Sequence, residues 1–204
     1  TREALDPVRY LSNYSSGKMG YALARAAHMA GALVTLISGP VSLPAPPDIS
    51  TFNVQSAHEM MQAVLDRLED GMIFIGAAAV ADYRPEHHAA EKVKKEGIED
   101  LTVKLVKNPD ILSQVAASDK ASYVVGFAAE TSNVIDFAEK KRISKQVDMI
   151  LANQVGRGLG FDAEDNQVTV LTADERIELP LLDKVQLAAR IIAILAANLQ
   201  NSAP

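Results

Sequence analysis

The stretch Ser-Asn-Tyr-Ser-Ser-Gly-Lys-Met-Gly at residues 12–20 is the first with the residue types for binding chemistry. Ser15 or Ser16 is suited to cap a helix that begins in the following alanine-rich run, and Gly17 or Gly20 permits a close backbone approach. The positive end of such a helix attracts phosphate or carboxylate. An ordinary capped helix with packing glycines remains an equal alternative, because neither G-x-x-x-x-G-K-[ST] nor G-x-G-x-x-G occurs here. A helix cap at Ser15 or Ser16 does not require an amide side chain two or three positions earlier, so capping does not explain the presence of Asn13.

Two apolar runs end in small residues followed by an acid. Residues 72–75 lead into Gly76, Ala77 and Ala78 and then Asp82, and residues 123–127 lead into Ala128-Ala129-Glu130. Both runs read as central parallel strands, whose carboxyl ends form the ligand-binding edge of an open α/β sheet. Asp82 could accept from a ribose hydroxyl or hold a cation, or could simply occupy a turn.

Basic side chains occur in three further places. Arg9 precedes Asn13 by four positions. Its guanidinium could bind a phosphate or carboxylate through two parallel hydrogen bonds, or it could remain a solvated charge on a loop. Lys92, Lys94 and Lys95 crowd like charges in a polar loop, which suggests a polyanion or a solvated charge run. Lys141 and Lys145 share a face of the expected helix 134–146, where they could bind a ligand or only favour the helix dipole.

The remaining pattern predicts an α/β, Rossmann-like fold with a mostly parallel sheet, helices on both faces and a β-hairpin extension. Ser56 and Glu59 have the spacing of a capping box at a helix start. Apolar and polar residues alternate over residues 101–106, which is typical of an edge or antiparallel strand. Pro109 and Asp110 are expected in the first turn of a short helix. The other expected elements are helices 17–30, 56–68, 109–117 and 184–199, strands 33–38, 51–54 and 148–152, and hairpin strands 166–171 and 176–179.

The composition narrows the class of protein. A chain of 204 residues with 48% hydrophobic content can form one domain over residues 1–204 with a substantial core. Its net charge of −6 argues against nucleic-acid binding, and the absence of cysteine removes disulfides and thiol chemistry. No apolar run spans a membrane, so we expect a cytoplasmic protein. The abrupt start at Thr1 suggests a fragment of a longer chain.

Six motifs in order resemble the phosphopantothenoylcysteine synthetase family, in the bacterial form that is the carboxy-terminal half of a bifunctional coenzyme A biosynthesis protein. These motifs are residues 6–9, 12–20, 78–83, 92–95, 107–111 and 126–131. The resemblance implies that CTP activates 4′-phosphopantothenate as an acyl-cytidylate, which L-cysteine converts to an amide. It also implies Mg²⁺ with the triphosphate and a homodimer. A strand before Thr1 and an FMN-dependent decarboxylase domain are expected further upstream.

The resemblance assigns roles to individual positions. Lys92 matches the lysine of the first step, Asn13 the amide that serves the second step, and Arg9 is expected beside Asn13. Lys141 and Lys145 match positions that hold the triphosphate. The remaining matches are nucleotide-site positions: Gly76, Ala77, Ala78, Asp82, Pro109, Asp110, Ile111, Leu112 and Phe127. The alternatives are a non-catalytic nucleotide-binding regulatory module and a Rossmann-type oxidoreductase, and the missing G-x-G-x-x-G argues against the second.

Overall fold

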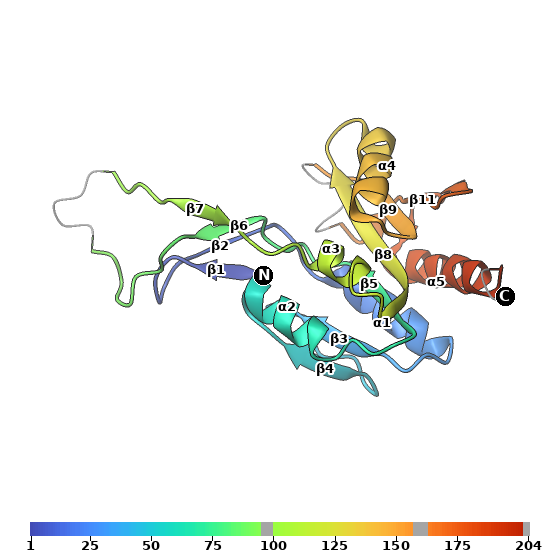
Figure 1. The fold of residues 1–204 in the computed structure, drawn as a ribbon, viewed down its shortest axis with the longest axis horizontal. Helices are drawn as coiled ribbons and strands as arrows, with labels where there is room; N and C mark the ends of the chain where they lie inside the picture. The colour runs from blue at the N-terminus through green and yellow to red at the C-terminus, as the bar shows by residue number, and fades with distance from the viewer. Residues whose placement is uncertain (95–99, 157–162, 202–204) are drawn as a thin grey trace.

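The core of the protein is a five-stranded mixed sheet in the order β12-β11-β9-β8-β5, seen in the computed structural model of residues 1–94, 100–156 and 163–201 (Figure 1). Strands β5, β8 and β9 are parallel, whereas β11 and β12 join as an antiparallel hairpin. The strands span Met72–Gly76 (β5), Ala121–Glu130 (β8), Met149–Gln154 (β9), Thr169–Leu171 (β11) and Arg176–Glu178 (β12). The predicted α/β fold with a hairpin extension is therefore confirmed.

Helices cover both faces of this sheet, as the sequence predicts. Alternate residues of β8 face opposite sides: Val125 packs in the cluster that contains α1 and α5, and Val124 in the cluster that contains α2, α3 and α4. The helices span Lys18–Met29 (α1), Ala57–Leu65 (α2), Ile111–Ala116 (α3), Val134–Lys145 (α4) and Lys184–Asn201 (α5). None of the helices in the described ranges is long and apolar enough to cross a membrane.

One expected central strand is less buried than its sequence predicts. Strands β3 (Thr35–Ser38) and β4 (Ser50–Asn53) form a parallel pair of their own, and β3 is not paired with β5. One edge of β5 therefore lacks a strand neighbour among the described residues, and Met72 and Ile73 are 37% and 43% exposed. The prediction that 72–75 is a central strand is therefore wrong, because β5 lies at the edge of the sheet, although Phe74 and Ile75 do pack against the clusters on opposite faces.

Two short antiparallel pairs form an arm that extends away from the sheet and helices (Figure 1). The arm consists of β1 (Arg2–Ala4), β2 (Tyr10–Ser12), β6 (Tyr83–Pro85) and β7 (Leu105–Lys107). The expected strand 101–106 is shorter than predicted, because β7 begins at Leu105, but its predicted antiparallel pairing is confirmed, with β6 as the partner. A last small pair is β10 (Asp165–Asn166) with β13 (Leu182–Asp183).

The residues at the N-termini of α1, α2 and α3 confirm one of the predicted helix caps and contradict another. Ser56 caps α2, since its Oγ accepts from the Glu59 N–H at 3.2 Å as predicted. The α1 N-cap is Gly17, in the left-handed conformation at φ +77 and without a side-chain cap, so the expected Ser15 or Ser16 cap is wrong. A Cβ at Gly17 would lie 2.7 Å from Val41 Cγ1, which accounts for glycine here. Asp110 is the N-cap of α3, and Pro109 precedes the helix instead of lying in its first turn.

Candidate functional site

A cleft of about 1210 Å³ opens where β5 and β8 end and α1 begins. It is lined by every expected site residue except Arg9 and Lys92. The two strands are parallel neighbours in register, with Gly76 opposite Gly126. The prediction that both strands finish at one edge of the sheet is therefore confirmed, and this edge forms one wall of the cleft.

Leu112 of α3 lies directly over the paired glycines. A Cβ at Gly126 would come 2.7 Å from Leu112 Cδ2, and one at Gly76 would come 3.5 Å from Leu112 Cδ1. Glycine at position 126 therefore lets α3 approach the sheet without displacing Leu112. The separation at Gly76 is an ordinary contact, and the tight neighbour there is Phe74, whose Cε1 would lie 3.1 Å from an added Cβ. The segment Pro109–Leu112 and Phe127 both line the cleft, although Leu112 and Phe127 pack against the clusters on opposite faces of the sheet. Sequence reasoning did not single out Gly126, although its register with Gly76 could have identified it.

The lysine pair of α4 reaches two different elements of the cleft. Lys141 Nζ donates to the Phe127 carbonyl at 2.7 Å, and Lys145 forms an ion pair with the carboxylate of Asp110. Both side chains therefore connect α4 to the cleft wall, as the spacing of four residues allows.

The charges around these lysines are mixed. Burial is the largest effect on Lys141 and lowers its pKa; nearby Glu130 and Asp82 oppose the shift, whereas Lys145 adds to it. Burial alone would raise the pKa of Asp110, but the hydrogen bond from Lys145 brings it below its usual value. The cleft thus holds two cationic side chains close to carboxylates, an arrangement that can accept an anionic ligand by exchanging internal ion pairs for external ones.

The turn after β5 is held by backbone contacts. The Asn108 N–H donates to the Asp82 carbonyl at 2.8 Å, and Asn108 Nδ2 donates to the Ala81 carbonyl at 2.8 Å. Gly20 of α1 approaches the same turn, where a Cβ would lie 3.6 Å from the Ala77 Cβ. Sequence reasoning included Asn108 in a motif but gave it no role; its role here is to join the two loops that line the cleft.

Asn13 lies against this turn. Its Nδ2 donates to the Val80 carbonyl at 3.2 Å, and the residue is exposed. An amide in this position faces solvent while one of its hydrogens is fixed to the loop after β5. The structure therefore brings Asn13 together with the residues after β5, 67 positions away in the sequence.

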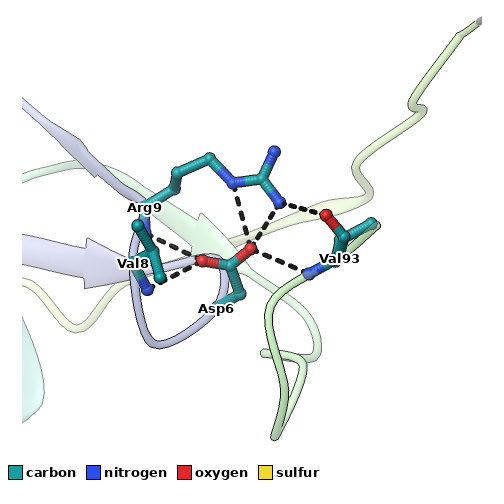
Figure 2. A network of polar contacts seen from close by, with 4 residues as sticks. All are labelled: Asp6, Val8, Arg9 and Val93. Atoms are coloured by element: carbon teal, nitrogen blue, oxygen red, sulfur yellow. Dashed lines mark hydrogen bonds and ion pairs between the residues drawn. The ribbon is translucent and has the colours of Figure 1, made fainter. Parts of the chain in front are cut away.

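Arg9 and Lys92 are not part of this cleft. Arg9 Nε donates to Asp6 Oδ2 at 3.0 Å, and Arg9 Nη2 donates to the Val93 carbonyl at 3.1 Å (Figure 2). Lys92, which precedes Val93, is exposed on the arm. These contacts hold the Arg9 side chain against Asp6 and Val93 and not beside Asn13, where it was expected. Lys95 lies outside the described residues.

The cleft is also lined by Lys18, Lys184, Asn153 and Asn166, polar residues to which sequence reasoning gave no individual role. Lys18 Nζ forms an ion pair with Glu164 at 2.5 Å, and Lys184 Nζ donates to the Ala163 carbonyl at 2.6 Å. Asn153 and Asn166 are buried and also line the cleft. No cluster of three or more potential metal-binding side chains occurs within the described ranges, and the adjacent histidines 87 and 88 form none.

Comparison with known proteins gives consistent matches over nearly the whole chain. Residues 1–199 match the family described as "DNA/pantothenate metabolism flavoprotein C-terminal domain". The chain is 53% identical over 185 residues to the coenzyme A biosynthesis bifunctional protein CoaBC of Escherichia coli K12, covering 89% of this chain and 46% of that protein. The corresponding protein of Vibrio parahaemolyticus is 50% identical over 195 residues, which cover 94% of this chain and 49% of the relative.

A solved structure shows the same architecture. The crystal structure of the C-terminal domain of a coenzyme A biosynthesis bifunctional protein CoaBC superposes with a TM-score of 0.83 at 40% identity, covering 99% of this chain and 92% of that domain. The chain spans about half the length of the curated relatives it matches. The mixed sheet, the arm and the cleft described above are accordingly those of a member of the DNA/pantothenate metabolism flavoprotein C-terminal domain family, to which this chain belongs.

Proposed function

We propose that this domain joins 4′-phosphopantothenate to L-cysteine in coenzyme A biosynthesis, with CTP as the activating nucleotide. The observation that carries the proposal is the cleft, in which strand-end backbone and two lysines from α4 meet Asn13. Family membership supports the pathway, because the relatives are coenzyme A biosynthesis proteins. Residues 1–204 would then be the synthetase domain of a longer bifunctional chain, with a flavin-dependent decarboxylase domain and a further strand upstream.

The nucleotide would lie along the end of the sheet. The backbone of Gly76–Ala78 would face a pyrimidine base, and the Phe127 ring, which also lines the cleft, would form a wall of its site. Asp82 lies at the end of this turn and would accept from a polar group of the nucleotide. Lys141 and Lys145 would bind the triphosphate, for which Lys145 would leave Asp110.

In the first step a carboxylate oxygen of 4′-phosphopantothenate attacks the α-phosphorus of CTP. A P–O bond forms as the bond to pyrophosphate breaks, and negative charge develops on the transferred group. A positioned lysine stabilises such charge, and Lys92 is our candidate. Mg²⁺ would arrive with the triphosphate and retain part of its water shell, as this ion usually does.

In the second step the cysteine amine attacks the acyl carbon, and the bond to CMP breaks as the amide forms. The acyl oxygen gains negative charge in this step. An amide N–H can stabilise that oxygen, and losing one such donor costs about 3–4 kcal/mol in related reactions. Asn13 is our candidate because its amide already lies beside the loop after β5.

A second copy of the chain would complete the site. Arg9 and Lys92 do not line the cleft of their own chain. They belong to the segments of the arm, which extends away from the main sheet (Figure 1). In a homodimer the arm of one protomer can reach the cleft of its partner, and a two-fold arrangement would supply both sites equally. We therefore propose a cytoplasmic homodimer in which the arm contributes to catalysis.

Product analysis tests the proposal directly. The domain is incubated with 4′-phosphopantothenate, L-cysteine, Mg²⁺ and one nucleoside triphosphate at a time, and products are identified by mass. We expect 4′-phosphopantothenoylcysteine and CMP in equal amounts with CTP. Nucleotide binding without either product would instead support a non-catalytic binding module.

A further inference from the structure

Asp6 is a buried carboxylate to which the proposed chemistry gives no task. The residue is 3% exposed, and both of its oxygens are occupied. Oδ1 accepts from the backbone N–H groups of Val8 and Arg9, each at 2.8 Å. Oδ2 accepts from Arg9 Nε at 3.0 Å, from Arg9 Nη2, and from the Val93 N–H at 3.2 Å (Figure 2).

This set of donors keeps Asp6 ionised. The hydrogen bond from the Arg9 guanidinium holds the pKa of Asp6 well below its usual value; burial opposes this, and the three backbone N–H groups reinforce it. Five N–H contacts use both oxygens of the Asp6 carboxylate as acceptors. A neutral side chain with only one acceptor oxygen cannot replace all of them. An asparagine there would direct an NH₂ group at another donor, so one contact would become repulsive.

The Val93 peptide is held on both of its polar sides. Its N–H donates to Asp6, and its carbonyl accepts from Arg9 Nη2, which links positions 84 residues apart in the sequence. A second connection lies four residues earlier, where the Ala89 N–H donates to the Leu5 carbonyl at 2.9 Å. Both connections end on the turn formed by residues 5–9, and they flank Lys92.

The flanking segment has few other attachments. The ribbon of β6 and β7 ends with the Glu86 N–H on the Lys104 carbonyl at 2.9 Å. Between these two residues, the hydrogen bonds that the described part of the segment makes to the rest of the chain go only to the turn 5–9. The main chain at Lys92 is therefore fixed mainly by Asp6 and Arg9, while the Lys92 side chain stays exposed.

We infer that Asp6 is a positioning residue for Lys92. By binding the Val93 peptide and orienting Arg9 onto it, Asp6 sets where the Lys92 ammonium can be presented to a reacting phosphate. This inference rests on the proposed function, in which Lys92 acts in the first step. Asp6 itself touches neither substrate nor reacting atoms in this account.

The kinetic test uses Asp6→Asn in the full domain. We expect pyrophosphate release to slow by about 10- to 100-fold, because small misplacements of a catalytic group cost that much, while the CTP dissociation constant stays unchanged. Lys92→Gln and the double variant Asp6→Asn/Lys92→Gln should then release pyrophosphate equally slowly. Glu178→Gln is the matched control, since it breaks an ion pair with Arg176 on β12 and should leave the rate unchanged.

Either of two rate measurements would overturn the inference: wild-type pyrophosphate release by Asp6→Asn, or a double variant slower than Lys92→Gln by the full Asp6→Asn factor. A loss of CTP binding in parallel with rate would indicate a merely structural role and would also overturn it.

Limited proteolysis tests the positioning role of Asp6 without relying on CTP binding or catalysis, so its outcome does not depend on the proposed function. Trypsin should cleave after Lys92 and Lys94 at least several-fold faster in Asp6→Asn than in the wild type or Glu178→Gln. Unchanged cleavage would contradict the positioning role even if the wild type proved to release no pyrophosphate at all.

Discussion

Replacing Gly126 by alanine tests how α3 is held at the cleft. The added Cβ would lie 2.7 Å from Leu112 Cδ2 and 3.1 Å from Ile150 Cδ1, so both side chains must shift within a packed region. Overpacking of this kind costs about 1–3 kcal/mol. For a domain of this size that corresponds to a fall in Tm of about 2–12 °C.

The measurement is chemical and thermal unfolding followed by circular dichroism. Gly20→Ala is the matched control: Gly20 lies in α1 with only an ordinary 3.6 Å contact ahead of its Cβ, so alanine should increase stability by about 0.5–1 kcal/mol. In the double variant Gly126→Ala/Leu112→Ala the 2.7 Å clash with Leu112 is removed while the 3.1 Å approach to Ile150 remains, and a favourable coupling of about 1 kcal/mol is expected. Additive losses in that double variant would refute the claim that Leu112 is the group that requires glycine.

Three further variants test other contacts. Asn13→Asp should release pyrophosphate normally yet accumulate acyl-cytidylate, detected by mass; normal amide formation would remove Asn13 from the second step. Because burial lowers the pKa of Lys141, wild-type CTP affinity should begin to fall at a pH below the usual lysine range, as the charge that binds the triphosphate is lost. The CTP affinity of Lys141→Arg, measured by calorimetry, should stay constant over the same pH range, because arginine keeps its charge. Identical pH profiles of CTP affinity for the wild type and Lys141→Arg would contradict this role. Ser56→Ala should lower the unfolding free energy by about 1 kcal/mol, since Ser56 caps α2; an unchanged value in urea unfolding would argue against the cap.

Elements with strong local patterns could be predicted from the sequence. Local patterns located the five helices of the described ranges: an alanine-rich amphipathic run for α1, cap and start signals for α2 and α3, and helical periodicity for α5, while the expected helix 134–146 matches α4. The apolar run at residues 148–152 located β9. The Ser56 and Glu59 pair identified a cap because both partners lie within one helical turn. These predictions succeed because the determining contacts are close in the sequence.

Features set by distant contacts were predicted poorly. Gly17 became the α1 cap because Val41, 24 positions later, leaves no room for a side chain. The strand at Leu105 pairs with β6 and not with the main sheet, which no periodicity could indicate. The exposure of Met72 likewise follows from the pairing of β3 with β4 alone, a matter of topology.

The candidate site divides in the same way. Residues at strand ends, such as Gly76 and Asp82, could be placed together because parallel strands end at one edge. The contact of Lys141 with the Phe127 carbonyl was compatible with the pattern but not required by it. The use of Arg9 by Asp6 and Val93 could not have been foreseen, since it depends on a segment 84 residues away.

The central claim is that the cleft at the ends of β5 and β8 binds the activating nucleotide. A crystal structure of the domain with CTP and Mg²⁺ measures this directly. Our account predicts the cytosine ring between the backbone of Ala78 and the side chain of Phe127, with triphosphate oxygens within hydrogen-bonding distance of Lys141 and Lys145. A nucleotide bound elsewhere on the molecule, with both lysines still on Phe127 and Asp110, would contradict it.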